Sequence, residues 1–304
     1  MTAFLSDCRL TLELLDRWSG PWPELVDALR AGPPVLLVAE GSSRLMPGGL
    51  AQVLARRRGL HGRIAACGGR EAQRLDLSRV RVLLASNSGR SREPMAAAQG
   101  LVKPLALVGV PGGPMTALGG PTRVLMPRPE VAIAATASVY AQVLTVAEAV
   151  CAAAGASAPI ARLRTGAAAA LADLPAAPAG VKRTFWCGGE DGLCDELALK
   201  MAETTGLPGF TCPGTMALHG VEELWAEGDL VVDLGLSGED AADLAKRAAA
   251  TPARVLRLAA QAEDDWAPLD RLCAGWMLLA AMAAAIGRDP AVPRRARKVG
   301  NPAP

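Results

Sequence analysis

The sequence has no excess of charge of either sign. Its 304 residues include 32 Lys and Arg against 30 Asp and Glu, so the formal net charge is only +2. A balance this close provides no overall field that would attract nucleic acid or a membrane surface. We therefore expect a small molecule as the partner, and neither nucleic acid nor a membrane.

Paired cysteines and long apolar segments are also missing. None of the seven cysteines forms a Cys-X-X-Cys pair, which indicates buried thiols in a reducing compartment. Charges interrupt the N-terminal segment before it reaches the length of a signal-peptide core. The most apolar region, Val131–Gly155, carries Gln142 and Glu148, so a buried helix is favoured over a transmembrane span. We expect a cytoplasmic protein.

Short apolar runs alternate with Ala- and Leu-rich helical patterns along most of the chain. This alternation is typical of α/β folds with parallel sheets. The predicted strands are Val35–Ala39, Arg63–Ala66, Arg81–Ser86, Leu105–Val108 and Arg123–Met126 in the first half, then Thr184–Cys187, Gly209–Thr211, Asp229–Asp233 and Arg254–Leu258 in the second. The longest predicted helix is Ile133–Ala154.

The pattern divides the chain into two modules. We expect an N-terminal module over residues 1–155, a linker with one helix over 156–180, a C-terminal module over 181–287 and a basic tail over 288–304. A weak internal echo supports a duplication, because VLLASNSGRSREPM and LVVDLGLSGEDAADLA both run from a strand through a Ser-Gly turn into a helix. The second copy has lost most of the hydroxyls.

The segment Ser86–Ser91 is a candidate phosphate-binding loop. It reads Ser-Asn-Ser-Gly-Arg-Ser and joins a predicted buried strand to a helix. Hydroxyl groups, a glycine that permits a tight turn and the unpaired N–H groups of a helix N-terminus suit a dianionic phosphate. In doubly wound sheets, ligands bind beyond the carboxyl ends of the strands, where this loop is predicted to lie.

A second loop of similar chemistry, Gly41-Ser42-Ser43, follows the strand Val35–Ala39. The alternative for both loops is that the serines only stabilise turns and helix N-termini. The recurrence of the pattern after two predicted strands favours the binding hypothesis.

Acid–base residues are expected in the second module. Lys200 and Glu203 are three residues apart in a helical pattern and share one face, although a surface ion pair would have the same spacing. His219 is one of only two histidines, and a structural role stays open for it. No His or Cys lies near it at metal-ligand spacing, so we predict neither a metal nor any other cofactor.

Together these motifs resemble the sugar isomerase (SIS) domain superfamily, in its double-module branch. The resemblance rests on Gly41–Ser43, Ser86–Ser91, Glu130–Thr136, Leu197–Glu203, His219 with Gly220, and Pro293–Val299. It implies two three-layer αβα modules, each with a mainly parallel five-stranded sheet flanked by helices. It also implies a homodimer with shared active sites.

The resemblance implies a role for each matching residue. Ser42, Ser43, Ser86, Asn87, Ser88 and Ser91 would hold the sugar phosphate, and Gly41, Ile133 and Thr136 would line the sugar pocket. Glu203 would move a proton between C2 and C1, with Lys200 beside it; His219 would assist ring opening, and Lys298 would close over the sugar from the tail.

The implied activity is aldose–ketose isomerisation, or deamination with isomerisation of an amino-sugar 6-phosphate. Two alternatives stay open at this point. One is a fructosamine-6-phosphate deglycase on the same scaffold, and the other is a non-catalytic sugar-phosphate sensor.

Overall fold

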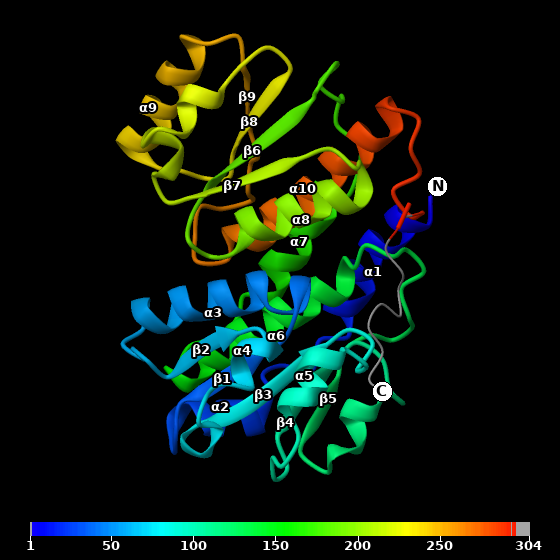
Figure 1. Cartoon of the computed structure of the whole chain (residues 1–304), viewed down its shortest axis with the longest axis vertical. Helices are drawn as coiled ribbons and strands as arrows, with labels where there is room; N and C mark the ends of the chain where they lie inside the picture. Colours follow the sequence, from blue (N-terminus) through cyan, green and yellow to red (C-terminus); the bar gives the residue numbers. More distant parts are fainter. Residues whose placement is uncertain (1, 293, 296–304) are drawn as a thin grey trace. The chain divides into compact units, whose positions relative to one another are not determined.

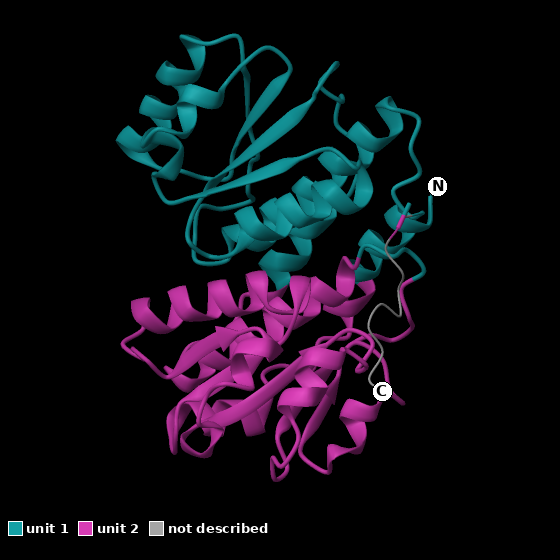
Figure 2. Cartoon of the chain, viewed as in Figure 1, with its two compact units in different colours: residues 1–12, 131–134, 161–294 teal, residues 13–130, 135–160, 295–304 magenta. Residues whose placement is uncertain are grey.

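The computed structural model describes residues 2–292, 294 and 295. They form two compact units, coloured separately in Figure 2. We call residues 13–130, 135–160 and 295 the five-stranded unit, and residues 2–12, 131–134, 161–292 and 294 the four-stranded unit. Helix α1 (Ala3–Asp16) contributes residues to both.

The five-stranded unit alternates strands and helices along the chain (Figure 1). Its elements are α2 (Pro23–Arg30), β1 (Val35–Val38), η1 (Gly41–Ser43), α3 (Leu45–Arg57), β2 (Ile64–Cys67), α4 (Gly69–Ala72), η2 (Leu77–Arg79), β3 (Arg81–Ser86), α5 (Arg92–Ala97), β4 (Leu105–Val108), η3 (Pro114–Leu118), β5 (Thr122–Val124) and α6 (Ala137–Ala153).

The sheet of this unit has the strand order β2-β1-β3-β4-β5, and all neighbouring strands are parallel. Because both faces are covered, the central strands β1 and β4 are buried at every position. On one face, Leu36, Val82 and Leu84 pack with Ala72 of α4 and Ala97 of α5. On the other face, Leu37 lies against α3 at Gly48.

The four-stranded unit contains the C-terminal elements. They are α7 (Ile160–Ala170), β6 (Arg183–Gly188), α8 (Leu193–Thr204), β7 (Gly209–Pro213), η4 (Met216–Leu218), η5 (Val221–Leu224), β8 (Asp229–Asp233), α9 (Gly238–Ala249), β9 (Arg254–Arg257) and α10 (Ala267–Ala285). Its sheet is parallel and has the order β7-β6-β8-β9.

Helices flank this second sheet as well. On one face Phe185, Cys187 and Val231 pack with Leu244 and Ala248 of α9. On the other face the Thr184 hydroxyl lies 4.0 Å from the sulfur of Met201 in α8. The expected α/β fold with parallel sheets flanked by helices is therefore confirmed.

For the second sheet, the strand pattern of the sequence and the family resemblance implied different numbers of strands, and the pattern correctly predicted four. The resemblance implied five strands, whereas the described part of this unit has four. After β9 the chain runs through the irregular, mostly exposed segment 258–266 and then directly into α10. No strand therefore follows β9 in this segment.

The long helix α6 begins later than predicted. The apolar pattern favours a helix from Ile133, but the structure has it from Ala137. The preceding backbone is held outside the helix, since the N–H groups of Val131 and Ala132 donate to the buried Asp7 carboxylate, at 2.8 and 2.6 Å. The Thr136 N–H donates to Glu130 Oε1 at 2.8 Å, and the same oxygen caps the helix by accepting from the Ser138 N–H at 3.2 Å.

Neither α6 nor any other helix within residues 2–292, 294 and 295 is both long enough and apolar enough to cross a bilayer.

Candidate functional site

Two serine-containing loops lie at one edge of the five-stranded sheet. Strands β1 and β3 are parallel neighbours, with Val38 opposite Leu84, so their carboxyl ends lie side by side. Gly41–Ser43 follows β1 as the short helix η1, and Ser86–Ser91 follows β3. This is the edge at which doubly wound sheets bind ligands.

The hydroxyls of Ser86, Ser88 and Ser91 form a compact cluster. Ser86 Oγ lies 2.9 Å from Ser91 Oγ and 3.5 Å from Ser88 Oγ. Ser88 Oγ also accepts a hydrogen bond from the Arg90 N–H at 3.2 Å. Ser86 is buried at the end of its strand, whereas Ser88 and Ser91 are half-buried. Three hydroxyls in this arrangement can turn to donate to one multivalent oxyanion.

The backbone of the loop is held rigidly. Gly89 has a φ of +63°, which favours glycine, and its carbonyl accepts from the Met115 N–H at 3.1 Å. A Cβ on Gly113 would collide with the carbonyls of Ser88 and Gly89, so the following loop packs tightly here. Helix α5 after the loop has only six residues. The fixed hydroxyls, and not the N-terminus of a long helix, are therefore the groups of this loop that can bind an anion.

A buried carboxylate connects the loop to helix α6. Asn87 Nδ2 donates to Glu130 Oε2 at 3.1 Å. Glu130 also accepts from the N–H and hydroxyl groups of both Thr136 and Ser138. Thr136 was predicted to line the sugar pocket, and in the structure its buried hydroxyl donates to Glu130 at 3.1 Å. Glu130 thus fixes Asn87 and the first turn of α6 in one arrangement.

A second carboxylate secures the loop after β1. Glu40 Oε1 accepts from the Gly69 N–H at 2.8 Å. Gly69 in turn packs so closely on the backbone of Glu93 that a Cβ would not fit. The loops after β2, β1 and β3 are therefore joined, with Ser42 and Ser43 half-buried among them. Ile133 is half-buried as well, on the segment that Asp7 anchors in the four-stranded unit.

Lys200 lies at the centre of a buried charge cluster in the four-stranded unit. Its Nζ is 2.7 Å from Glu203 Oε2 and 3.3 Å from Glu196 Oε1. Lys200 and Glu196 are fully buried, whereas the side chain of Glu203 is 26% exposed. Burial alone would lower the pKa of Lys200, but the carboxylates of Glu196 and Glu203 together outweigh it and raise this pKa above its ordinary value.

Lys200 is therefore a permanent cation beside Glu203. Its ammonium is the ion-pair partner of the Glu203 carboxylate at 2.7 Å, and a carboxylate is a group that can act as a general base. Because Glu203 is still partly exposed, it can reach a ligand without breaking the helix. This arrangement differs from a surface ion pair, since the lysine itself has no contact with solvent.

His219 is exposed and follows η4 in the loop after β7. The Leu218 carbonyl accepts from Arg247 Nη1 at 3.1 Å, and the Gly220 N–H donates to Glu222 Oε2 at 2.7 Å. These bonds brace the loop on both sides of His219 and leave its ring in solvent. Lys298 lies outside the described residues.

Three carboxylates of these clusters were not among the predicted site residues. Glu196 was detectable, because it precedes Lys200 by four residues in the same helical pattern. Glu130 belongs to a segment that carries the family resemblance, but its bond to Asn87 spans 43 residues. The hydrogen bond between Glu40 and Gly69 joins residues 29 positions apart, and no local sequence pattern indicated it. In the described part of the chain, no three His, Cys, Asp or Glu side chains are arranged to hold a metal ion.

Comparison with known proteins gives structural matches only. No protein-family model matches the sequence. No curated protein matches it either.

Solved structures match over nearly the whole chain. Glucosamine-6-phosphate deaminase from Thermotoga maritima has a TM-score of 0.80 at 18% identity, with 97% of both chains covered. Tagatose-6-phosphate ketose/aldose isomerase from Escherichia coli has a TM-score of 0.72 at 19% identity, covering 97% of this chain and 96% of that one. The C-terminal domain of glucosamine-fructose-6-phosphate aminotransferase from Francisella tularensis has a TM-score of 0.73 at 14% identity, covering 94% and 96%. The resemblance to SIS-domain phosphosugar isomerases is thus confirmed for the fold.

Proposed function

We propose that the protein is an enzyme that processes a sugar phosphate, either an aldose–ketose isomerase or an amino-sugar 6-phosphate deaminase/isomerase. The observation that carries this proposal is the cluster of Ser86, Ser88 and Ser91 hydroxyls at the carboxyl end of a buried parallel strand. The names of the structures with the same fold, a deaminase and an isomerase of sugar 6-phosphates, support the same class of substrate.

In this proposal the serine hydroxyls, together with Ser42, Ser43 and Asn87, hold the phosphate. The phosphate group takes no part in the proton transfer, so its role is to position the sugar. Thr136 and Ile133 limit the space for the sugar carbons. Asn87 and Thr136 act as a pair here, since both are bonded to Glu130.

Glu203 is the proposed base. Its carboxylate removes the proton from C2 of the open-chain aldose, the C2–H electrons form the C1–C2 double bond of an enediol, and the carbonyl π electrons move to O1. The proton of the O2 hydroxyl is transferred to O1, the C2–O2 bond becomes the ketone carbonyl, and Glu203 returns its proton to C1. Lys200 lies beside the Glu203 carboxylate as its fixed counterion, and Glu196 keeps Lys200 charged in its buried position. His219 assists ring opening, and Lys298 covers the sugar.

Replacement of Glu203 tests this function. A panel of hexose, amino-hexose and fructosamine 6-phosphates is incubated with the wild-type protein. Sugar products and amino acids are separated by chromatography before mass spectrometry, which resolves a ketose from its aldose, and ammonia is measured by an enzyme-coupled assay. For a sugar that is turned over, E203Q is expected to lower kcat by about 10²–10⁴, the usual contribution of a general base. E227Q, which changes an exposed carboxylate in the same unit, serves as the matched control. Full activity of E203Q would refute the mechanism.

The products also separate the alternatives. Ammonia indicates the deaminase, a ketose alone indicates the isomerase, and a free amino acid indicates the fructosamine-6-phosphate deglycase. Binding with no chemical change over hours indicates a sugar-phosphate sensor. The hydroxyl cluster is compatible with the sensor, because it requires neither Glu203 nor His219. The dimer with shared active sites stays a prediction, and light scattering that gives the mass of a single chain would contradict it.

A further inference from the structure

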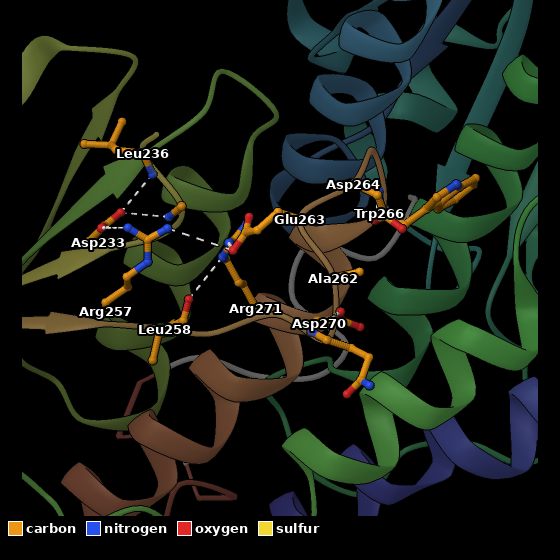
Figure 3. Close-up of polar contacts among 12 residues, drawn as sticks. Asp233, Leu236, Arg257, Leu258, Ala262, Glu263, Asp264, Trp266, Asp270 and Arg271 are labelled. Atoms are coloured by element: carbon orange, nitrogen blue, oxygen red, sulfur yellow. Dashed lines mark hydrogen bonds and ion pairs between the residues drawn. The ribbon is translucent and has the colours of Figure 1, made fainter. Parts of the chain in front are cut away.

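The carboxyl edge of the second sheet holds a cluster of two arginines and two carboxylates (Figure 3). Asp233 ends β8, Arg257 ends β9, Glu263 lies in the following irregular segment, and Arg271 comes from the first turns of α10. The cluster takes no part in the function proposed above. Its two carboxylates differ in how firmly they are bound.

Arg271 is held in one position by the fold. Its side chain is only 4% exposed, and its Nε donates to the Leu258 carbonyl at 3.1 Å. The guanidinium lies so close to the backbone of Gly235 that a Cβ would collide with it, and Gly235 has a φ of +102°. Arg271 is therefore a hydrogen-bond donor fixed in place before any ligand binds. Because its guanidinium cannot turn into solvent, removing every anion from it would destabilise the fold.

Asp233 is committed to the fold. Its Oδ1 accepts from the N–H groups of Gly235 and Leu236, both at 2.8 Å, and its Oδ2 accepts from Arg257 Nη1 at 3.1 Å. These bonds occupy both oxygens and shape the loop after β8. Asp233 thus cannot serve as a removable counterion.

Glu263 is the removable partner. Its side chain is 59% exposed and lies in a segment without helix or strand. Glu263 Oε1 accepts from Arg271 Nη2 and lies 3.9 Å from Arg257 Nη2. Rotation of this side chain into water would leave Arg257 and Arg271 opposite the single charge of Asp233. The position of the Glu263 carboxylate would then attract an external anion of the same shape.

We propose that Arg271 and Arg257 form a second ligand site, for a small organic carboxylate, in which Glu263 is the internal competitor. The ligand carboxylate takes the position of the Glu263 carboxylate, accepts a hydrogen bond from Arg271 and forms an ion pair with Arg257. An internal competitor acts at an effective concentration of roughly millimolar, so it weakens binding of the external anion to the wild-type protein. A carboxylate is favoured over other anions because a carboxylate already fits the position.

Malonate is the probe for this site. Its binding is measured by calorimetry and thermal unfolding at constant ionic strength for wild type, E263Q, E227Q and the double variant E263Q/R257Q. We expect E263Q to bind malonate at least tenfold more tightly than wild type, E227Q to match wild type, and the added R257Q to remove the gain. Equal affinities of E263Q and wild type, or no effect of R257Q, would overturn the proposal.

Two further variants keep the test decisive. If E263Q does not fold, wild type and R257Q are compared at millimolar malonate. Arg257 is 48% exposed, so its replacement is expected to be tolerated; equal binding by the two proteins would again refute the site. The double variant S86A/S91A, which removes hydroxyls of the proposed phosphate loop, is expected to bind malonate as wild type does. A failure of the phosphosugar function would therefore leave this result unchanged.

Discussion

Replacing Lys200 by methionine removes the cation from a cluster in which Glu196 has no contact with solvent. Methionine retains the length and most of the volume of the lysine stem, so few packing contacts are lost. The main effect is electrostatic. The Glu196 carboxylate, fully buried and 3.3 Å from Nζ in the wild type, would be left without its counterion.

The expected loss can be estimated from this geometry. Removing one partner of a buried ion pair costs about 3–5 kcal/mol, because the remaining charge stays buried and loses its counterion. Glu203 adds little, since its partly exposed side chain can turn towards water. With an m-value of about 2 kcal/mol per M, K200M should lower the urea midpoint of the four-stranded unit by about 2 M.

The deficit should depend on pH with a defined sign. In wild type the pKa of Lys200 is raised, so its contribution is present at all pH values below its unfolded pKa and is lost only in strong alkali, as pH rises through the folded pKa. In K200M, burial should raise the pKa of Glu196 above its unfolded value. Glu196 is then neutral at low pH and increasingly destabilising as pH rises, so the deficit should be larger at pH 8 than at pH 5.

Urea unfolding at these two pH values, followed by tryptophan fluorescence, provides the measurement. The matched control is K246M, which replaces an exposed helical lysine in the same unit and should change stability by less than about 0.5 kcal/mol. The double variant K200M/E196Q should recover much of the loss. A deficit of K200M as small as that of K246M, or one that is the same at both pH values, would refute the electrostatic reasoning.

Two further predictions concern the phosphate loop. E130Q replaces the carboxylate oxygen that accepts from Asn87 Nδ2 by an amide NH₂ group, which cannot accept. Because buried donors then lose their partner, we expect the free energy of unfolding to fall by roughly 2–4 kcal/mol. Inorganic phosphate should also bind E130Q more weakly, and unchanged affinity in calorimetry would mean that Glu130 does not position the loop. G109A places a Cβ on the Asn87 side chain, so it should displace the loop and weaken phosphate binding at least tenfold, while wild-type affinity for phosphate would contradict this contact.

The strands were predictable because both sheets are parallel and covered on both faces. Under these conditions a central strand is a continuous apolar run, as in Leu105–Val108, and turn residues mark its ends. The predicted bounds of β3, β4 and β8 agree with the structure, and the other strands differ by one or two residues at either end. The strand order β2-β1-β3-β4-β5 was not predicted, because parallel connectivity alone allows several orders.

The start of α6 shows where the local helical pattern of the sequence fails to predict a helix boundary. Residues 133–136 have the composition of the helix that follows, so periodicity extends it to Ile133. The side chains that keep this segment out of the helix, Asp7 and Glu130, act through tertiary hydrogen bonds. The bond of Asp7 joins residues 124 positions apart, which no local pattern can report.

By itself the sequence determined the α/β class, the parallel strands, the serine-rich loop and the Lys200–Glu203 spacing, because each depends on residues close together in the chain. Only the tertiary structure decided that Lys200 is buried between two carboxylates, that Glu130 binds Asn87, and that Arg271 is locked against Gly235. These three features depend on how helices pack on sheets, since burial and long-range bonds determine which charges are solvated and which must find a partner inside the protein.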